Sequence, residues 1–440
     1  MDYLSNIMFA ILLILGLGFF VSNVKKIIRN IKLGQNVDRF DRPSARLKNM
    51  ALIALGQQKM LKKPIMGILH VVVYVAFIII NIELLEIIID GLFGTHRIFA
   101  FLPFYNFLIA SFEILAFLVL VAVIIFWTRR NIIKLKRFIS SDLNGWPRSD
   151  ANYILYFEVV LMTLFLFMNG ADLFLQQQNY SHYHAAGSFP ISQFLIPVFN
   201  RFSVDNVALF EQIVWWLHIT GILIFANYLY FSKHLHILLA FPNTYFADLN
   251  VEGKFDNLKS VTNEVKLMMD PNADPFATPV ADVNAAPTKF GAADVHDLNW
   301  VQLLNAYTCT ECGRCTDACP ANITGKKLSP RKIMMQTRDR LEEVGKNIDK
   351  NKGIFIPDNK TLLNDYITSE ELWACTSCNA CVEECPVNIS PLSIILDMRR
   401  YLVMEQSAAP MSLNAMMANI ENNGAPWQYN QQDRLNWAKD

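Results

Sequence analysis

The apolar residues of this chain gather in five long runs, all within its first 231 residues. Each run reaches the roughly 20 residues that a helix needs to cross the hydrocarbon core of a bilayer. The runs are Tyr3–Asn23, Ile65–Leu92, Phe104–Trp127, Tyr153–Leu175 and Val207–Phe231. The alternation of apolar and polar residues that marks a strand is scarce throughout the chain. The pattern therefore predicts a mainly α protein with a five-helix transmembrane bundle.

The composition agrees with a membrane protein. Hydrophobic residues make up 53% of the 440 residues, and Phe alone occurs 31 times. The 39 Lys and Arg side chains balance 39 Asp and Glu side chains, so the formal net charge is zero. A neutral chain offers no electrostatic basis for binding nucleic acid, and the predicted bundle makes the lipid bilayer a partner.

The first apolar run is predicted to be a membrane anchor and not a signal peptide. The residues before it carry no positive charge, and no small-x-small cleavage site follows it. Basic residues follow instead, at Lys25, Lys26, Arg29 and Lys32. Under the positive-inside rule, such a run has its amino terminus outside.

The basic residues of the remaining loops predict the same orientation. Residues 24–64 and the stretch from Arg129 to Arg148 are rich in Lys and Arg, whereas the loops around Arg97 and Arg201 are nearly free of them. Loops rich in Lys and Arg stay in the cytoplasm. Five spans then place the amino terminus outside and the carboxyl-terminal half in the cytoplasm.

The composition changes after the fifth run and divides the chain into four predicted parts. Pro, Asp, Ala and Asn are frequent in residues 269–295, as is typical of an extended linker or arm. The last residues are rich in Asn, Gln, Ala and Met, and are expected to lie on a partner or to be poorly ordered. The parts are a membrane domain (1–245), a linker (246–296), a soluble domain (297–404) and a tail (405–440).

All eight cysteines of the chain fall into two copies of one pattern, Cys-x2-Cys-x2-Cys-x3-Cys-Pro. The first copy holds Cys309, Cys312, Cys315 and Cys319, and the second holds Cys375, Cys378, Cys381 and Cys385. This is the spacing of bacterial ferredoxins with two [4Fe–4S] clusters, in which the fourth cysteine of each run binds the other cluster. The predicted ligand sets are Cys309, Cys312, Cys315 with Cys385, and Cys375, Cys378, Cys381 with Cys319.

Two other roles for the cysteines agree less well with the spacing. Zinc sites usually combine two separated Cys-x2-Cys pairs, whereas each run here places four cysteines within eleven residues. Disulfides persist in oxidising compartments, and the cytoplasm expected for this half of the chain keeps thiols reduced. The cysteines therefore predict one-electron transfer.

Three of the eight histidines are candidate haem ligands. His70 lies at the cytoplasmic start of the second run, and His236 lies where the fifth run leaves the bilayer on the same side. Both are expected at one depth, which predicts one haem b between them. His218 precedes His236 by five helical turns, or about 27 Å along one helix face, as two haems stacked across a membrane would require. The alternative for His236 is an interfacial residue like its neighbour His234.

The segments around these histidines resemble a known family of membrane cytochromes. Gly67-Ile-Leu-His70-Val71 and Ser232-Lys-His-Leu-His236 resemble the nitrate reductase gamma-subunit type of five-helix dihaem cytochrome b, and especially the E-type subunit of membrane-bound heterodisulfide reductase. The two cysteine runs, with Cys-Gly-Arg-Cys at 312–315, resemble the C-type subunit of that reductase. The resemblance covers about residues 1–245 and 297–400. It implies an E–C fusion in the cytoplasmic (inner) membrane of a prokaryote, with an α-helical ferredoxin domain after the bundle.

The chain departs from the family pattern at one position. In the gamma-subunit pattern a second histidine follows the first by ten residues, and here that position is Ile80, which cannot bind iron. His218 therefore loses its expected partner, and the sequence leaves a second haem open. His96, His182 or His184 in the outer loops could replace that partner, although nothing in their spacing favours any of them.

Five acidic residues are expected in the outer half of the spans, namely Glu83, Glu86, Glu113, Asp172 and Glu211. Ionisable residues at membrane depth are costly and often mark proton or ligand paths. His218, Glu83 and Glu113 are therefore candidates for a quinol-oxidation site that releases protons outward. The alternative is that several of the acidic residues, above all Glu86 and Glu211, sit at helix ends and face water.

Together these patterns predict a membrane-anchored electron-transfer subunit. It would pass electrons, in a direction that the sequence leaves open, between the quinone pool, haem b, two [4Fe–4S] clusters and a cytoplasmic cysteine-rich catalytic subunit, which the resemblance to heterodisulfide reductase implies. The Pro-rich arm (residues 269–296) and the tail after Met404 are the expected contacts with that partner. No Rossmann fingerprint or phosphate loop occurs, which argues against direct use of NAD or ATP. The alternatives are a self-contained quinone-linked oxidoreductase and a redox sensor that signals through its clusters.

Overall fold

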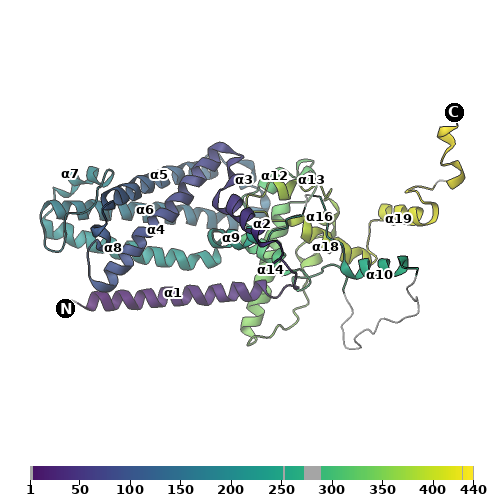
Figure 1. Cartoon of the computed structure of the whole chain (residues 1–440), viewed down its shortest axis with the longest axis horizontal. Helices are drawn as coiled ribbons and strands as arrows, with labels where there is room; N and C mark the ends of the chain where they lie inside the picture. The colour runs from purple at the N-terminus through teal and green to yellow at the C-terminus, as the bar shows by residue number, and fades with distance from the viewer. Residues whose placement is uncertain (1–2, 251–252, 272–288, 429, 440) are drawn as a thin grey trace.

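The computed structural model describes residues 3–250, 253–271, 289–428 and 430–439. Every regular element in these residues is a helix, and none is a strand. A bundle of long helices forms one half of the molecule, and shorter helices around a compact core form most of the other half (Figure 1). The predicted mainly α fold class, with a membrane bundle followed by a helical cysteine-rich region, is confirmed.

The five long helices of the bundle are long and apolar enough to cross a membrane. They are α1 (Leu4–Ile31), α4 (Pro64–Phe93), α5 (Tyr105–Asn131), α6 (Trp146–Gln177) and α8 (Val204–Tyr228), which the 3-10 turn η6 (Leu229–Phe231) continues. α1 packs on α4 and α8, α4 packs on α5, α5 on α6, and α6 on α8, so the five helices close into a ring. All five predicted apolar runs therefore correspond to membrane-length helices.

α1 contributes one narrow stripe of side chains to the bundle. Phe9 and Ile27 are buried, whereas Ile14 is 69% exposed on the outer face, where the acyl chains of a bilayer would cover it. Phe9 fits because α4 has a glycine opposite it, and a Cβ atom at Gly91 would lie 2.8 Å from the Phe9 ring. Gly91 therefore determines how closely α1 approaches α4.

Short elements fill the space between the bundle and the second half. They are α2 (Pro43–Met50), the π-helical turn η1 (Ala51–Leu55), α3 (Gln58–Leu61), the 3-10 turn η7 (Lys233–Leu235) and α9 (His236–Tyr245). The fully buried Arg46 on α2 joins them, because its guanidinium donates hydrogen bonds to the carbonyl oxygens of Tyr245 (3.2 Å) and Ala247 (2.9 Å). The second half packs on these elements.

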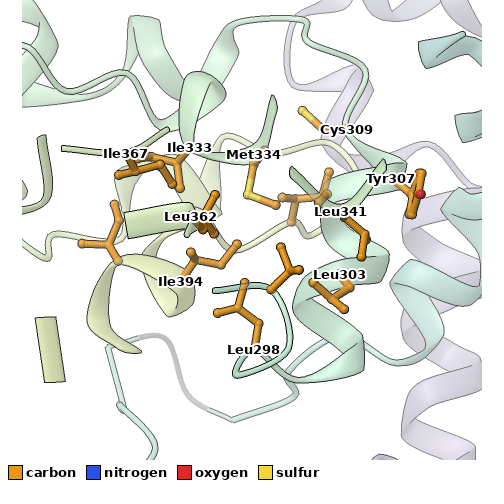
Figure 2. Close-up of a cluster of buried hydrophobic side chains, with 14 of the residues drawn as sticks. Leu298, Leu303, Tyr307, Cys309, Ile333, Met334, Leu341, Leu362, Ile367 and Ile394 are labelled. Carbon is orange, nitrogen blue, oxygen red and sulfur yellow. The ribbon is translucent and has the colours of Figure 1, made fainter. Parts of the chain in front are cut away.

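Three longer helices enclose the core of the second half, α11 (Trp300–Thr308), α14 (Pro330–Lys350) and α18 (Pro391–Met404). Short helices connect them, namely α12 (Arg314–Asp317), α13 (Pro320–Ile323), α15 (Leu362–Asp365), α16 (Ser369–Trp373) and α17 (Ala380–Glu383). Figure 2 shows Leu303, Leu341 and Ile394 in one buried cluster, with Cys309 at its edge. Full burial of each such side chain stabilises the fold by about 1.5–3 kcal/mol.

The local sequence determines where these helices begin. The Asn299 side chain accepts hydrogen bonds from the first turn of α11, and the Gln302 side chain accepts one from the Asn299 backbone N–H. At α14 the Ser329 hydroxyl caps the first turn, and Pro330 occupies a position whose N–H has no helical partner. These caps position the loops that carry the cysteines.

The segment expected as a linker contains a helix and ends in packed structure. α10 (Lys259–Met269) lies within it, and much of the expected Pro-rich arm (residues 272–288) falls outside the described residues. From Ala292 onward the chain is packed on the core, with Val295 fully buried. Asp294 is anchored by the buried Arg340, whose Nε donates to it at 3.0 Å. The compact domain of the structure therefore begins a few residues before position 297.

The remaining elements are peripheral. They are η2 (Ile98–Phe101), η3 (Lys136–Phe138), η4 (Ser141–Leu143), η5 (Ser192–Leu195), α7 (Ile196–Phe199), α19 (Met411–Asn423), η8 (Gln431–Asp433) and η9 (Asn436–Ala438). In the described part of the tail, α19 buries none of its residues and extends away from the core (Figure 1).

Charged and polar side chains attach the second half to one end of the bundle. The guanidinium of Arg331 on α14, which is 1% exposed, bonds both carboxylate oxygens of Asp142 in the loop between α5 and α6, at 3.0 and 2.6 Å. Asn30 at the end of α1 donates to the Tyr307 hydroxyl at 2.8 Å. Because these contacts are largely shielded from water, they hold the two halves in one relative position.

Candidate electron-transfer site

The first predicted cysteine set comes together in one cavity. Cys309 follows α11, Cys312 and Cys315 lie at the start of α12, and Cys385 arrives from the loop after α17. All four line the same small cavity, together with Arg314 and with Cys381 of the second set. The structure therefore brings the fourth cysteine of the second run to the first three cysteines of the first run.

The second predicted set shows the reciprocal arrangement. Cys319 lies close enough to both Cys375 and Cys381 for their charges to interact, and Cys378 is near the same two residues. Cys378 is the one exposed cysteine of the eight, whereas Cys309, Cys319, Cys381 and Cys385 are buried. The second set therefore lies nearer the protein surface than the first.

The two cysteine runs share a backbone conformation that their sequences do not reveal. Glu311 and Gly313 have φ angles of 55° and 77°, and the equivalent residues of the second run, Ser377 and Asn379, have 55° and 60°. Left-handed conformations on both sides of the second cysteine turn the chain around a central point. At Gly313 the requirement is also steric, because a Cβ atom would lie 2.7 Å from an Arg331 nitrogen.

The environment of the thiols fits iron–sulfur clusters. Burial raises the pKa of Cys309 and Cys381 to about 12 and that of Cys385 to about 11, and neighbouring cysteines add to each shift. Thiolates at these positions therefore need a cationic partner of the kind that cluster iron supplies. The backbone N–H groups of Ser377 and Ile389 point at Cys375 Sγ (3.4 Å) and Cys385 Sγ (3.3 Å), where such bonds tune the potential of a cluster.

His70 and His236 face each other at the junction of the bundle and the second half. Their ring centroids are 6.5 Å apart. Metal–imidazole bonds of about 2 Å on either side of one iron would give a separation of this size. The Nδ1 atom of His236 contacts the Lys233 carbonyl at 3.2 Å, which leaves Nε2 available. Burial also lowers the pKa of His236, so its imidazole is neutral as a ligand must be. The two residues fit a bis-histidine haem.

The alternative that His234 and His236 are only interfacial residues conflicts with their packing. The His234 ring packs on Phe225 at 5.5 Å and on His236 at 5.4 Å. Burial lowers the pKa of His234 to about 3. Both histidines are therefore partly buried where the bundle meets the second half, and they contact protein side chains on at least one face.

Arg314 links the histidine pair to the first cysteine set, a position that the spacing of the cysteines alone does not reveal. The Arg314 guanidinium lies close enough to the His70 ring for their charges to interact, and it lines the cavity of Cys309, Cys312 and Cys315. Its Nη1 atom donates to the Lys59 carbonyl at 3.2 Å, which fixes the guanidinium in place. The Cys-Gly-Arg-Cys motif was the available signal for this residue.

A buried ion-pair network lies beside the first cysteine set. Glu311, between Cys309 and Cys312, is bonded by Lys233 from the end of the bundle and lies 2.9 Å from Arg338 on α14. Burial alone would raise the pKa of Glu311, but the charges of Lys233 and Arg338 outweigh it and lower the pKa. Glu311 therefore connects the membrane helices, the cysteine loop and the second half, a role that the motif spacing could not predict.

At the opposite end of the bundle, the predicted membrane carboxylates surround Arg97. This guanidinium is 8% exposed and bonds Asp172 Oδ2 (2.8 Å), Glu83 Oε1 (3.2 Å) and Asn169 Oδ1 (2.7 Å). Asp172 also accepts a contact from His96 Nε2 at 3.0 Å. In the sequence, the loop around Arg97 is notable only for its scarcity of basic residues. The single Arg proves to be the centre of the polar network at this end.

The alternative that Glu86 and Glu211 face water is wrong. Glu86 is 2% exposed and accepts hydrogen bonds from the Phe99 N–H (2.8 Å) and the Tyr105 hydroxyl (2.9 Å). Glu211 is 8% exposed and accepts one from the Tyr183 hydroxyl at 2.7 Å. The loops beyond the helix ends fold back over both carboxylates, which hydropathy alone does not show.

Glu113 belongs to the same outer region, whereas His218 stands apart from it. Glu113 Oε2 accepts the backbone N–H groups of Ile191 (2.9 Å) and Ser192 (3.1 Å). His218 on α8 packs on Phe165, with ring centroids 5.9 Å apart, and its Nδ1 atom has no hydrogen-bond partner among the described residues. The hydrogen bonds of the described residues do not join His218 to Glu83 or Glu113.

The position that could complete a second haem site holds no ligand. Ile80 is packed among apolar side chains of the bundle. The candidate replacements His96, His182 and His184 gather instead at the outer end. The His96 ring centroid lies 5.7 Å from that of His182 and 6.4 Å from that of His184. The structure therefore brings these three residues together but does not join them to His218.

The cysteines and the membrane bundle together indicate the class of protein. Eight thiols in two groups of four, held against the end of a membrane bundle, are the arrangement of a membrane-anchored iron–sulfur electron-transfer protein. Residues 308–389 match the 4Fe–4S dicluster domain family. The prediction of iron–sulfur clusters is confirmed, and the zinc alternative is not supported.

Several known proteins are similar to the chain. A probable iron–sulfur-binding oxidoreductase, FadF of Bacillus subtilis, is 30% identical over 98% of the chain and 60% of its own length. The EtfAB:quinone oxidoreductase of Syntrophomonas wolfei is 26% identical over 91% of the chain and 55% of its own length. The C-type subunit of a heterodisulfide reductase of Methanosarcina acetivorans is 32% identical over 24% of the chain and 52% of its own length.

The chain thus spans about three-fifths or less of the length of these relatives. The resemblance to iron–sulfur oxidoreductases and to the C-type subunit of heterodisulfide reductase is confirmed, and the membrane bundle is consistent with a membrane-anchored fusion. No solved structure matches the chain.

Proposed function

We propose that the chain is an electron-transfer subunit that connects the quinone pool, through haem b and two [4Fe–4S] clusters, to a catalytic partner in the cytoplasm. One observation carries this proposal. The histidine pair His70 and His236, Arg314, and the first cysteine set are contiguous, and the second set continues toward the exposed Cys378. Such a series of adjacent sites suits the passage of single electrons from the membrane to the surface.

The protein residues would supply position and insulation in this scheme. When bound, haem and iron–sulfur clusters supply the one-electron chemistry. His70 and His236 hold their rings at a fixed separation, and Glu311 with Lys233 keeps the first cysteine loop on the bundle. The apolar surroundings of the cysteines exclude water, which tunes the potential of a cluster.

The orientation of the proposed protein follows from its basic loops. Residues 24–64 and 129–148, which are rich in Lys and Arg, lie at the end of the bundle that carries the cysteine-rich half (Figure 1). Because such loops stay in the cytoplasm, we place the cluster domain in the cytoplasm and the Arg97 network at the outer face of a prokaryotic inner membrane.

A quinone as the membrane substrate agrees with the name of one relative, an EtfAB:quinone oxidoreductase. Quinol oxidation releases two electrons and two protons for each quinone formed, so a site that oxidises quinol also needs proton acceptors. Glu83 Oε2 is buried and has no hydrogen-bond partner among the described residues. We propose that Glu83, with Glu113 and His218 deeper in the bundle, forms a proton-accepting quinone site near the outer face.

The outer site is tested by a charge-neutral substitution. Glu83→Gln should slow the reduction of the purified protein by added menaquinol several-fold, because the amide cannot accept a proton, while the cluster spectra stay unchanged. His218→Ala is the second variant. Stopped-flow absorbance measures the rates, and Asn206→Ala, at an exposed position near the start of α8, is the matched control. Unaltered kinetics in both variants would exclude a quinone site at this position.

A separate catalytic partner agrees with the use of the cysteines. All eight are assigned to clusters, and the similar heterodisulfide reductase protein is itself named as one subunit of a larger enzyme. The exposed Cys378 and the exposed helices α10 and α19 offer contacts on the side away from the membrane. We therefore propose that a cysteine-rich subunit or module docks near the second cysteine set.

The proposed function is tested with the purified chain in lipid nanodiscs. Menaquinol should reduce the clusters, as followed by electron paramagnetic resonance, and steady turnover should require an artificial acceptor until the co-purifying partner is added. The chain with Cys378→Ser, which removes a ligand of the outermost cluster, should lose transfer to the acceptor first. If the pure chain alone converts a soluble physiological substrate, the subunit hypothesis fails.

A further inference from the structure

An apolar groove opens at the junction between the bundle and the cluster domain. Its volume is about 570 Å³, within the usual range of roughly 300–1,000 Å³ for small-molecule sites. The cytoplasmic end of α1, one face of α9 and the start of α11 form its walls. Ile28 and Leu238 stand at its mouth, 47% and 44% exposed, so the groove opens outward at the height of the membrane surface.

Aromatic rings form a firm wall on one side of the groove. Phe246 meets Phe40 with ring centroids 5.5 Å apart and Trp300 with centroids 4.9 Å apart, and both contacts are edge to face. The Trp300 indole N–H donates to the Val37 carbonyl at 3.0 Å, which fixes the ring in the wall. A planar ring inserted here would meet three aromatic groups that are already in place.

The polar groups of the groove are few and unengaged. Of the residues that line it, only Lys32 and Asn36 carry polar side chains. Among the described residues neither side chain has a hydrogen-bond or ion-pair partner. Both end in N–H donors, and they are four residues apart at the end of α1. They therefore suit a ligand with carbonyl or hydroxyl oxygens at one end and a long apolar remainder.

The groove lies next to the candidate haem ligand. Leu235, Leu238 and Leu239 turn one face of α9 and of the turn before it toward the groove, while His236 on the same segment faces His70. A helix with its side chains is about 10 Å across, so a ligand in the groove would lie within about one helix diameter of the histidine pair. The outer site is far from that pair, because His218 lies ten residues, or about 15 Å, before the end of α8. The chain leaves the helical conformation at Ser232 (φ −118°, ψ 146°) before His236 begins α9, so the prediction that the two histidines share one helix face is wrong.

Resting on the proposed function, we infer that this groove binds the ring and the first prenyl units of a membrane quinone on the cytoplasmic side. The apolar walls accept the tail, the aromatic wall accepts the ring, and Lys32 with Asn36 donates to its oxygens. A structural phospholipid fits less well, because one lysine is a small counterpart for a phosphate headgroup and the aromatic wall has no role with acyl chains. With Ile80 in place of a second haem ligand, this is also the quinone position nearest to the remaining histidine pair.

The test uses a photoreactive probe on the full chain in nanodiscs. An azido-naphthoquinone with a short prenyl tail should label peptides of α1 and α9, and menaquinone-4 should displace it. Ile28→Trp should reduce labelling about tenfold by filling the mouth. Ile14→Trp is the matched control, since Ile14 lies about four helical turns away on the same helix and is exposed to lipid. Lys32→Gln, at an exposed position, should weaken labelling several-fold without affecting folding.

The outcomes separate the groove from the broader proposal. Labelling elsewhere, equal labelling in Ile28→Trp, or displacement by cardiolipin but not by menaquinone-4 would overturn the assignment of the groove. If menaquinol still reduces the clusters in that case, the proposed function stands and only this site is rejected. If menaquinol fails to reduce the clusters of the unmodified chain, the proposed function fails, whatever the probe labels.

Discussion

The two ends of the bundle use polar side chains in opposite ways. At the outer end opposite charges pair with one another, as Arg97 does with Asp172 and Glu83. Single atoms such as Glu83 Oε2 have no partner there among the described residues. At the inner end the imidazoles and thiols are brought close together without satisfying one another, and His70 Nδ1 has no partner among the described residues. Paired charges stabilise the outer end, whereas the converging imidazoles and thiols of the inner end suit further groups bound between them.

The sharpest test of the inner end concerns the exchange of the fourth cysteines. Cys319→Ser should remove the cluster bound by the second run, so that cluster iron falls from about eight to about four atoms per chain. Cys378→Ser should abolish the same paramagnetic signal, and Cys312→Ser should abolish the other. Iron analysis and electron paramagnetic resonance measure both effects. If Cys319→Ser and Cys312→Ser remove one shared signal, the ligand sets are not exchanged.

The histidine pair predicts an equally complete but more local loss. His70→Ala and His236→Ala should each abolish the same absorption band of reduced haem b, because the two rings face one another across one site. The clusters should remain, since neither histidine binds them. His218→Ala should leave this band intact, and a second band that disappears in this variant would demonstrate a second haem despite Ile80. An unchanged haem spectrum in both His70→Ala and His236→Ala would refute the ligand assignment.

The outer end predicts a loss of stability without a loss of cofactor. Arg97→Gln removes the guanidinium between Glu83 and Asp172 and leaves buried carboxylates uncompensated, which typically costs about 3–5 kcal/mol. Thermal unfolding in detergent measures the loss, while iron content should stay constant in the folded fraction. The control is Arg201→Gln at an exposed position, which should change stability by less than about 0.5 kcal/mol. Equal stability of the two variants would contradict the role of Arg97 as the centre of the network.

A smaller effect is expected where the cluster domain meets the bundle. Asp142 is partly buried, which raises its pKa, but hydrogen bonds from Arg331 and Ser140 outweigh this and lower the pKa below its usual 3.8. The stabilisation is therefore fully present above about pH 4 and is lost as the pH falls through the lower value in the folded state. Asp142→Asn should cost about 1–3 kcal/mol at pH 7.

The pH dependence of the same pair supplies the control for this junction. The difference in unfolding temperature between the unmodified chain and Asp142→Asn should shrink as the pH is lowered below about 4. Asp317→Asn, at an exposed position of the same domain, should behave like the unmodified chain at every pH. A difference that persists unchanged into acid would show that the carboxylate charge is not what holds the junction.

The features that follow from hydrophobic periodicity or from a sequence motif were predicted well. A membrane-length apolar run forms a helix in lipid, because its backbone groups must then be hydrogen-bonded within the same segment. All five runs correspond to helices. The cysteine spacing likewise predicted the cluster domain, which the match of residues 308–389 to the 4Fe–4S dicluster domain family confirms, while the division into two ligand sets stays a prediction. These features are local enough to be inferred from the order of residues.

Features that depend on loops returning to the bundle were not predictable in the same way. Arg97 lies in a loop with no unusual pattern, and its importance arises because the loop folds inward over carboxylates from α4 and α6. Glu311 is hidden inside the cysteine motif, and its partners Lys233 and Arg338 are far away in the sequence. The burial of Glu86 depends on Phe99 and Tyr105 in the same way. In each case the decisive contact is tertiary.

The buried ties between the cluster domain and the bundle have a mechanical consequence. Arg331 with Asp142, Lys233 with Glu311 and Asn30 with Tyr307 join the halves at three separate places. Three such contacts oppose the hinge motion that a swinging carrier domain would need. The distance between the histidine pair and the first cysteine set is then constant. If the proposed partner exists, electron flow would therefore be controlled at the second cysteine set, by the binding and release of that partner.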